Sequence, residues 1–273
     1  MKKFDGWLLI SDLDGTLLNS ECSISKENAE AIRRFVEEGG DFTVATGRIP
    51  KSACSFIPEI MPTLPIIAQN GMDIYDHVSN KALLSIEIGS ECCELIDIAY
   101  REFPDMAIEM LSGNDIYVSR PSYLTKEHIR IVKFEPIYID DVRHAPKPWR
   151  KVHFWDTDEN LKKLIARFDE ETKGKQLPYR YMQTLEWLCE IFSKEADKWL
   201  ALDKMLKIIG KKYDKIVAIG DFDNDAMMVK NADIGFAPSN ATELVKTCAD
   251  IVLTENNNEN AVAAAIEILF QKY

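Results

Sequence analysis

Long apolar runs are missing from this sequence, and their absence excludes two classes of protein. No stretch approaches the roughly 20 apolar residues that a membrane-spanning helix needs, so we expect no membrane partner. The basic residues at positions 2 and 3 look like the start of a secretory signal, but Asp5, Asp12 and Asp14 interrupt the apolar stretch that would have to follow. The sequence therefore predicts a cytoplasmic protein.

Cysteine is scarce and lacks the spacing of metal ligands. None of the six cysteines belongs to a CxxC pair, so neither a cysteine zinc site nor a disulfide framework is predicted. Reduced, partly buried thiols in a cytosolic protein are the expected state. The six are Cys22, Cys54, Cys92, Cys93, Cys189 and Cys248.

Positive charge is also in short supply. Lysine and arginine number 33 against 45 aspartates and glutamates, which gives a formal net charge of −12. No dense basic block is present, and binding to a polyanion draws its affinity from clustered Lys and Arg, so a nucleic-acid partner is not expected. An acidic protein still binds phosphate esters if a metal or a few placed cations offset the repulsion.

The chain of 273 residues does have alternating strand and helix patterns at both ends. In the first third, apolar runs at 7–11, 42–45 and 66–68 each end in small polar residues, and 25–38 has helical spacing with Ser25 as N-cap. Strand, helix, strand at this spacing predicts a parallel sheet. The same rhythm returns after residue 197, with a helix at 198–212 and a strand at 215–219.

The middle of the chain has a different pattern. Helical segments at 91–103 and 158–171 alternate with pairs of short strands, such as 107–110 with 116–119, which indicates antiparallel hairpins. We therefore predict an α/β fold: a doubly wound, Rossmann-like parallel core at 1–82 and 189–273, interrupted by an inserted α+β cap domain at 83–188.

Carboxylates and small polar residues follow the predicted parallel strands. The carboxyl ends of parallel strands share one edge of the sheet, where ligands bind, so distant residues can share a pocket. Alternating aspartates after residue 220 suggest an EF-hand, but Ala226 and Ala232 stand where that loop needs Gly and Glu. A carboxylate cage suited to Mg²⁺ remains. The strand-end residues are Asp12, Asp14, Thr46, Asp221, Asn224 and Asp225.

Four ordered motifs give the sequence a family resemblance. They are DLDGTL at 12–17, ATGR at 45–48, KWLAL at 198–202 and GDFDND at 220–225. In order and spacing they resemble the motifs of haloacid-dehalogenase-like hydrolases, and QNG at 69–71 with ADIGFAPSNA at 232–241 looks like the Cof-type branch. That branch is similar to sugar-phosphate phosphatases with a large α/β cap.

The resemblance implies a role for each motif residue. Asp12 would be the nucleophile, since its carboxylate is ionised at neutral pH, and Asp14 would be the general acid and base. Thr46, Gly47, Lys198 and Asn224 would bind the phosphate group. Mg²⁺ would be held by Asp12, Asp14 through its backbone carbonyl, Asp221 and Asp225.

One motif departs from the usual pattern. Trp199 stands where glycine usually follows the lysine, which leaves Lys194 as a competitor for Lys198, and the indole either crowds the loop or packs against the cap. Asp223 is expected to be an exposed loop carboxylate, and Arg48 either reaches substrate or forms a structural ion pair.

The cap is expected to select the substrate. For its charged and polar candidates the default interpretation is an exposed surface residue rather than a substrate contact. They include Glu109, Asn114, Arg120, Lys147 and Arg180.

The sequence thus predicts a Mg²⁺-dependent phosphatase of small phosphorylated metabolites, with sugar phosphates favoured. A small-molecule phosphate ester is its expected partner, and a monomer or small homo-oligomer its expected state. Two alternatives stay open: a phosphomutase or other phosphotransferase that uses the same phospho-aspartate, and a receiver-like protein that stores an aspartyl phosphate without turnover.

Overall fold

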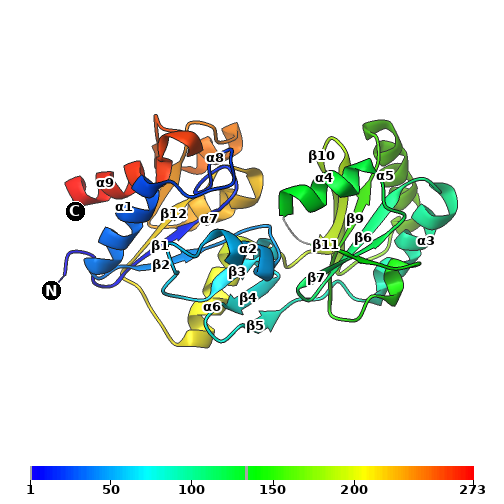
Figure 1. Cartoon of the computed structure of the whole chain (residues 1–273), viewed down its shortest axis with the longest axis horizontal. Coiled ribbons are helices and arrows are strands. Elements are labelled where there is room, and N and C mark those ends of the chain that lie inside the picture. The colour runs from blue at the N-terminus through cyan, green and yellow to red at the C-terminus, as the bar shows by residue number, and fades with distance from the viewer. Residues whose placement is uncertain (1, 133–134) are drawn as a thin grey trace. The chain divides into compact units, whose positions relative to one another are not determined.

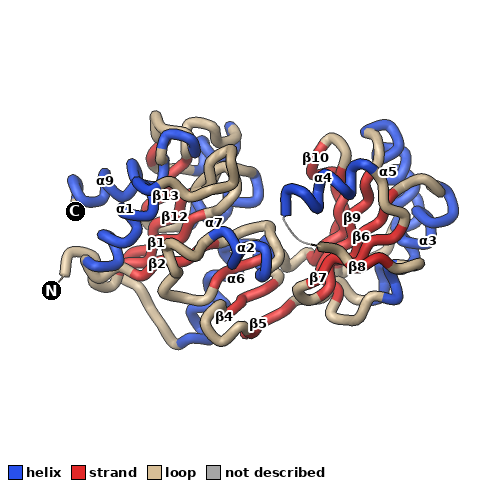
Figure 2. The backbone as a smooth tube through the Cα atoms, in the orientation of Figure 1, coloured by secondary structure: helices blue, strands red, loops and turns tan. Residues whose placement is uncertain are grey.

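The computed structural model describes residues 2–132 and 135–273, and the chain divides into two compact units. Unit 1 comprises residues 1–84 and 197–273, and unit 2 comprises 85–196. Figure 1 shows the chain coloured by residue number, so the two segments of unit 1, before and after residues 85–196, can be told apart by colour. Both units contain sheets with helices against them (Figure 2).

Unit 1 is built on a parallel five-stranded sheet, which confirms the predicted α/β class. All neighbouring pairs in this sheet run parallel, and the central strand pairs with strands from both segments of the unit. The order across the sheet is β14 (Ile251–Val252), β13 (Ile234–Ala237), β12 (Lys215–Ile219), β1 (Trp7–Ser11) and β2 (Asp41–Val44).

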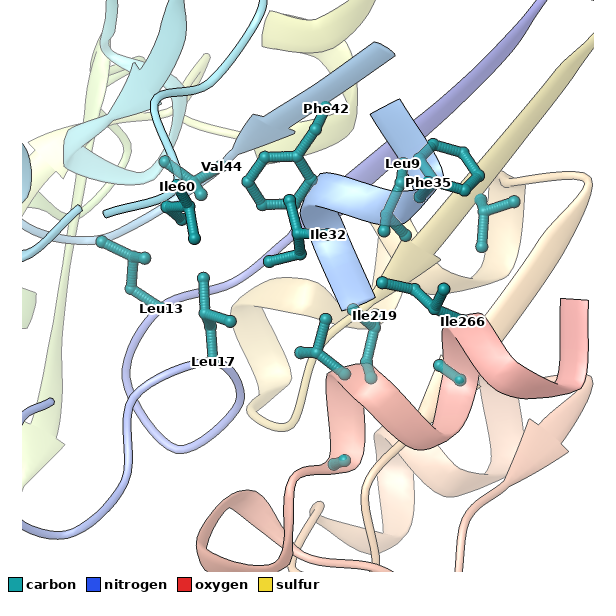
Figure 3. Close-up of a cluster of buried hydrophobic side chains, with 14 of the residues drawn as sticks. Leu9, Leu13, Leu17, Ile32, Phe35, Phe42, Val44, Ile60, Ile219 and Ile266 are labelled. Carbon is teal, nitrogen blue, oxygen red and sulfur yellow. The ribbon is translucent and has the colours of Figure 1, made fainter. Parts of the chain in front are cut away.

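Helices cover both faces of the parallel sheet. On one face, α1 (Lys26–Glu37) and α9 (Ala261–Lys272) pack together over Leu9 and Ile219. Figure 3 shows these side chains converging on Ile32 of α1 and Ile266 of α9, with Phe42 from β2 beside them. On the other face, α6 (Lys198–Ile209) packs on Leu8 and Ala218. The remaining helices of the unit are α2 (Pro50–Phe56), α7 (Ala226–Asn231) and α8 (Glu243–Cys248).

A small side sheet departs from the predicted topology. The strand expected at 66–68 forms as β3 (Ile66–Ala68), but it pairs antiparallel with β4 (Asp73–Asp76), which continues to β5 (Lys81–Ser85). Its link to the parallel sheet is an isolated bridge between Ala45 and Ile67. That bridge is parallel, as the spacing predicted, but it is a single contact, and the tight turn at 69–71 also brings β4 back onto β3 in a separate three-stranded sheet.

Unit 2 has a six-stranded sheet made largely of the predicted antiparallel hairpins. Its order is β10 (Tyr179–Leu185), β11 (Leu188–Ser193), β9 (Trp149–Trp155), β6 (Ala107–Ser112), β7 (Asp115–Ser119) and β8 (Ile137–Tyr138). Its helices are α3 (Cys93–Glu102), α4 (Tyr123–Val132) and α5 (Asp158–Thr172).

The insertion extends further along the chain than residue 188, where the sequence pattern placed its end. Strand β11 pairs along its length with both β9 and β10, so its residues belong to the sheet of unit 2. Unit 2 ends at Ala196. All six cysteines are unpaired. No helix within the described ranges is long and apolar enough to cross a membrane.

Candidate active site

The parallel sheet brings two aspartates from distant parts of the sequence to one edge. Asp12 directly follows β1 and Asp221 follows β12, and Ser11 pairs with Ile219 at the ends of these strands. The backbone N–H of Asp12 donates to the carbonyl of Ile219 at 3.0 Å, which fixes the two chain segments beside each other. One carboxylate oxygen from each of Asp12, Asp221 and Asp225 lies within 4.8 Å of the others.

Lys198 is the buried cation of this cluster. Its Nζ lies 2.5 Å from Oδ1 of Asp12 and 2.6 Å from Oδ1 of Asp225, and the residue is 1% exposed. Lys198 begins α6, whose N-terminus is capped by the Asp197 side chain. Lys194 is exposed and belongs to the other unit. Of the two lysines, Lys198 is therefore the one that contacts these carboxylates.

Trp199 does not obstruct this arrangement. The indole is partly buried and packs against the apolar cluster that includes Leu8, Ile10 and Leu202 in unit 1. The bulky residue that replaces the usual glycine is thus accommodated by the sheet-facing core of its own unit.

Asp225 is held in place by backbone donors. Its Oδ2 accepts hydrogen bonds from the N–H groups of Asp221 and Phe222, both at 3.1 Å. A Cβ at Gly220 would overlap the Asp225 side chain, so only glycine lets the strand end approach this closely. Asp225 therefore contributes fixed charge and orients the loop that carries Asp221.

Asp221 is fixed from the first motif. The hydroxyl of Thr16 donates to its Oδ1 at 2.6 Å, across 205 positions of sequence. Gly15 has a φ of +77°, and a Cβ there would overlap Oδ2 of Asp221. The turn after Asp14 thus positions the carboxylate of Asp221, which comes from the second segment of unit 1.

The cluster has an excess of negative charge. Burial raises the pKa of Asp12 well above its ordinary value; Lys198 opposes this shift, and Asp225 adds to it. Burial likewise raises the pKa of Asp221 to about 6, against the hydrogen bond from Thr16. Burial by itself lowers the pKa of Lys198, but the adjacent Asp12 and Asp225 outweigh it and raise that pKa.

This donor set fits a hard divalent cation. Three carboxylates face a single ammonium group, and oxygen ligands of this kind are those that Mg²⁺ and similar ions prefer. Because Asp225 already accepts hydrogen bonds at both oxygens, Asp12 and Asp221 are the better placed ligands. The cluster could therefore hold a divalent metal.

Asp14 lies apart from that cluster and is paired with Arg48. The guanidinium donates from Nε to Oδ2 at 2.8 Å and from an Nη to Oδ1 at 2.5 Å, which is a bidentate pair. Arg48 is itself fixed, with its guanidinium carbon 4.2 Å from the centre of the Phe56 ring. The Asp14 side chain remains 49% exposed, so it is both oriented and accessible.

The second motif is joined to the fourth through Asn70. Thr46 is fully buried and its Oγ1 accepts from the backbone N–H of Arg48 at 3.1 Å, which leaves its hydroxyl hydrogen free to donate. A Cβ at Gly47 would lie 3.1 Å from Oδ1 of Asn70. The same oxygen accepts from Nδ2 of Asn224 at 2.9 Å, so Gly47 and Asn224 lie on either side of one side chain.

Several contacts of the site escaped sequence reasoning. The sequence leaves open whether Arg48 reaches substrate or forms a structural ion pair, and it names no partner for it; Thr16 and Asn70 lie within the motifs without an assigned role. The one clue to these residues in the sequence is that they belong to the motifs. Their hydrogen-bond partners lie 34 to 205 positions away, so no local sequence pattern indicates the contacts. Asp223 is exposed, as expected, and accepts a hydrogen bond from Thr242.

Glu109 differs from the sequence prediction. It is 0% exposed, whereas the sequence predicts an exposed surface charge at this position. Arg180 and Lys147 are exposed, while Asn114 and Arg120 are half-buried.

Comparison with known proteins agrees with this site. A family model described as haloacid dehalogenase-like hydrolase matches residues 9–266. The 5-amino-6-(5-phospho-D-ribitylamino)uracil phosphatase YwtE of Bacillus subtilis is 30% identical, with 94% of this chain and 96% of that protein covered. The phosphoglycolate phosphatase of Methanopyrus kandleri is 26% identical, with 96% of this chain and 97% of that protein covered.

Solved structures show the same fold. A haloacid dehalogenase-like hydrolase from Bacteroides thetaiotaomicron superposes with a TM-score of 0.85 at 27% identity, covering 96% of this chain and 99% of that one. A protein from Thermotoga maritima gives a TM-score of 0.82 at 26% identity, with 96% of each chain covered.

Proposed function

This chain belongs to the haloacid dehalogenase-like hydrolases and is a phosphatase of that family, and from this premise we propose a Mg²⁺-dependent enzyme that hydrolyses small phosphorylated metabolites. Sugar phosphates are the favoured class. The observation that carries the proposal is the buried contact of Lys198 with Asp12 and Asp225, beside Asp221.

Asp12 is the proposed nucleophile. Lys198 engages its Oδ1, so Oδ2 is the oxygen that attacks phosphorus while the bond from phosphorus to the ester oxygen breaks. Asp14 gives its proton to the departing alkoxide. A water molecule then attacks the phosphorus of the aspartyl phosphate and passes a proton to Asp14, which releases inorganic phosphate and regenerates the Asp12 carboxylate.

The obstacle to this attack is repulsion between an anionic nucleophile and an anionic phosphate. Asp12 and Asp221 with the backbone carbonyl of Asp14 would hold Mg²⁺. Asp225 would orient the loop that carries Asp221. When bound, Mg²⁺ neutralises charge on nucleophile and phosphate together. Lys198 supplies a further compact positive charge at Asp12.

Hydrogen-bond donors complete the phosphate site. The free hydroxyl hydrogen of Thr46 and the second amide hydrogen of Asn224 are the proposed donors to phosphate oxygens, and the absence of a side chain at Gly47 leaves room for them. Donors fixed in advance stabilise a developing charge without reorganising during the reaction.

We also propose that unit 1 is the catalytic core and that unit 2 is the cap that selects the substrate. The names of two relatives support a small phosphate monoester as partner, because one acts on a phosphorylated ribityl compound and the other on phosphoglycolate. The unpaired cysteines agree with a reducing cytoplasmic compartment.

Phosphate release from an aryl phosphate and from a panel of sugar phosphates tests the proposal. We expect turnover with Mg²⁺, loss of turnover with a chelator, and a fall of more than about 10³-fold for Asp12→Asn, because covalent catalysis is then lost. Asp223→Asn is the matched control: it changes an exposed aspartate of the neighbouring loop and should keep wild-type activity.

Two outcomes would contradict the proposal. Activity that survives both chelation and Asp12→Asn would show that phospho-Asp12 is not on the path. Transfer of the phosphoryl group to an added sugar in preference to water would identify a phosphotransferase instead.

A further inference from the structure

A row of titratable side chains crosses one face of the unit 2 sheet. Glu109 of β6 pairs directly with His153 of β9, and His153 pairs with Glu190 of β11. Residues opposite each other in register point to the same face. These three residues are 0%, 5% and 8% exposed, respectively, in the middle of the sheet, where charged groups need partners.

Helix α4 adds a second histidine to this row. The Nδ1 atom of His128 lies 2.9 Å from Oε2 of Glu109, and its ring centre is 4.8 Å from that of Trp155. Leu124, one turn earlier, packs with Trp155 and Leu188. Phe154, on the opposite face, packs against Phe168 of α5, so α4 and α5 lie on opposite sides of the sheet (Figure 1).

The distances suit a metal site. Oε2 of Glu109 is 2.9 Å from Nδ1 of His128 and 3.3 Å from Nδ1 of His153, and one ligand atom from each residue lies within 4.8 Å of the others. Ligands bonded at about 2.0 to 2.2 Å in a tetrahedral site lie roughly 3.3 Å from one another. The second oxygen of Glu109, Oε1, is buried with no hydrogen-bond partner among the described residues.

A carboxylate lies next to the outer nitrogen of His153, although Nε2 has no hydrogen-bond partner in the part of the chain that the structure describes. Nε2 of His153 lies 3.0 Å from Oε1 of Glu190, and Nζ of Lys151 lies 3.1 Å from the same oxygen. A histidine that ligates a metal through one nitrogen commonly donates the other N–H to a carboxylate, which fixes the tautomer and orients the ring.

We propose that Glu109, His128 and His153 form a binding site for a divalent transition-metal ion, with Zn²⁺ as the representative. Two imidazole nitrogens favour zinc, cobalt, nickel or copper over magnesium. The site lies wholly within unit 2, so it goes beyond the proposed phosphatase activity and does not depend on it. A bound ion would tie α4 to β6 and β9.

A metal-free explanation predicts a different experimental result. Two buried glutamates are also balanced if Lys151 and a protonated His153 supply the positive charge. In that case the row is a closed ion-pair network with no affinity for zinc.

The experiment is a zinc titration of the full chain, stripped of metal and kept in excess Mg²⁺ to occupy oxygen-ligand sites. Calorimetry should give one Zn²⁺ per chain, and Co²⁺ should give visible absorption from a nitrogen and oxygen site. We expect Glu190→Gln to weaken zinc binding by about 10- to 100-fold as an outer partner, and His128→Gln and His153→Gln to weaken it more.

Two control variants show whether zinc binds at the proposed site and not elsewhere on the chain. His144→Gln changes an exposed histidine of the same unit and should leave zinc affinity unchanged. Asp12→Asn should also keep it, which separates this site from the carboxylates of unit 1. His128 is partly exposed on a helix surface, so its variant is expected to fold even if His153→Gln does not, and circular dichroism checks this.

Three results would overturn the proposal. The first is no zinc binding by the wild type, and the second is equal zinc affinity in His128→Gln and His144→Gln. The third is a higher KM for the phosphate ester in metal-free His128→Gln with unchanged zinc affinity, which would assign the row to substrate recognition.

Discussion

At the scale of single residues, the pair of Arg48 and Asp14 is the least expected part of the active site. The guanidinium occupies both oxygens of the proposed general acid and is held by the Phe56 ring behind it. In the proposed mechanism Arg48 is therefore a positioning residue that orients the carboxyl toward the leaving group.

We predict that Arg48→Ala affects substrates according to their leaving groups. Misplacing a catalytic group by about 1 Å costs on the order of 10²-fold in rate, and a sugar alkoxide needs protonation whereas a nitrophenolate does not. The variant should thus lose far more kcat on sugar phosphates than on an aryl phosphate. Steady-state kinetics on both substrates measure this, and equal losses on the two would show that Arg48 does not act through Asp14.

At the scale of elements, one side chain connects two helices of the core. Asn28 of α1 is 1% exposed; its Nδ2 donates to the carbonyl of Leu17, and its Oδ1 accepts from the backbone N–H of Ala263 at 2.9 Å. Helix α9 begins after Asn260, whose own side chain makes no capping hydrogen bond. Asn28 therefore caps α9 from a neighbouring helix.

We predict that Asn28→Ala lowers the free energy of unfolding of unit 1 by about 1 to 3 kcal/mol, because buried backbone groups of two segments lose their partners. Asn28→Asp keeps the acceptor for Ala263 and should lose less. Glu30→Ala, on the exposed face of the same helix, should change stability by no more than about 0.5 kcal/mol. Urea unfolding compares the three, and equal losses for Asn28→Ala and Glu30→Ala would rule out the cap.

Local patterns predicted many of these elements. Apolar runs located β1 and β12, and Ser25 was identified as the N-cap of α1, where it accepts from the N–H of Asn28. Because parallel strands end at one edge, Asp12 and Asp221 were expected to lie together, whereas Lys198, which begins α6, was expected there only from the family resemblance.

Pairings that depend on tertiary contact left no such trace. The apolar run of β3 does not show that this strand pairs antiparallel with β4 in addition to its parallel bridge from Ile67 to Ala45. Glu109 looked exposed because a lone glutamate in a strand usually is, and its partners His128 and His153 lie 19 and 44 positions away. The row of buried titratable side chains in unit 2 could therefore be recognised only from the structure.

At the scale of the whole molecule, one chain forms two units, and each unit has its own hydrophobic core. Unit 1 is closed around Leu9, Phe42 and Ile266, while unit 2 buries its own apolar sheet face. Chains with more than one domain often depart from a single two-state transition.

We predict that the two units unfold in separable transitions. Asn28→Ala should lower the transition of unit 1 alone, and Zn²⁺ should raise that of unit 2 alone, since a ligand stabilises the unit that binds it. Hydrogen exchange followed by mass spectrometry assigns each peptide to its transition. If peptides of both units shift together in Asn28→Ala, the chain unfolds as one cooperative body.

The order of strands in unit 1 has a consequence for how the protein is made. Strand β1 leaves the ribosome well before its hydrogen-bonded neighbour β12, which lies more than 200 residues later, since Trp7 pairs with Lys215. At a synthesis rate of about 5 to 20 residues per second, the nascent chain waits roughly 10 to 40 s for that partner. During this interval one edge of an apolar strand is unpaired, while unit 2 emerges complete. Asp12, the proposed nucleophile, is thus translated long before the strand that fixes its position beside Asp221.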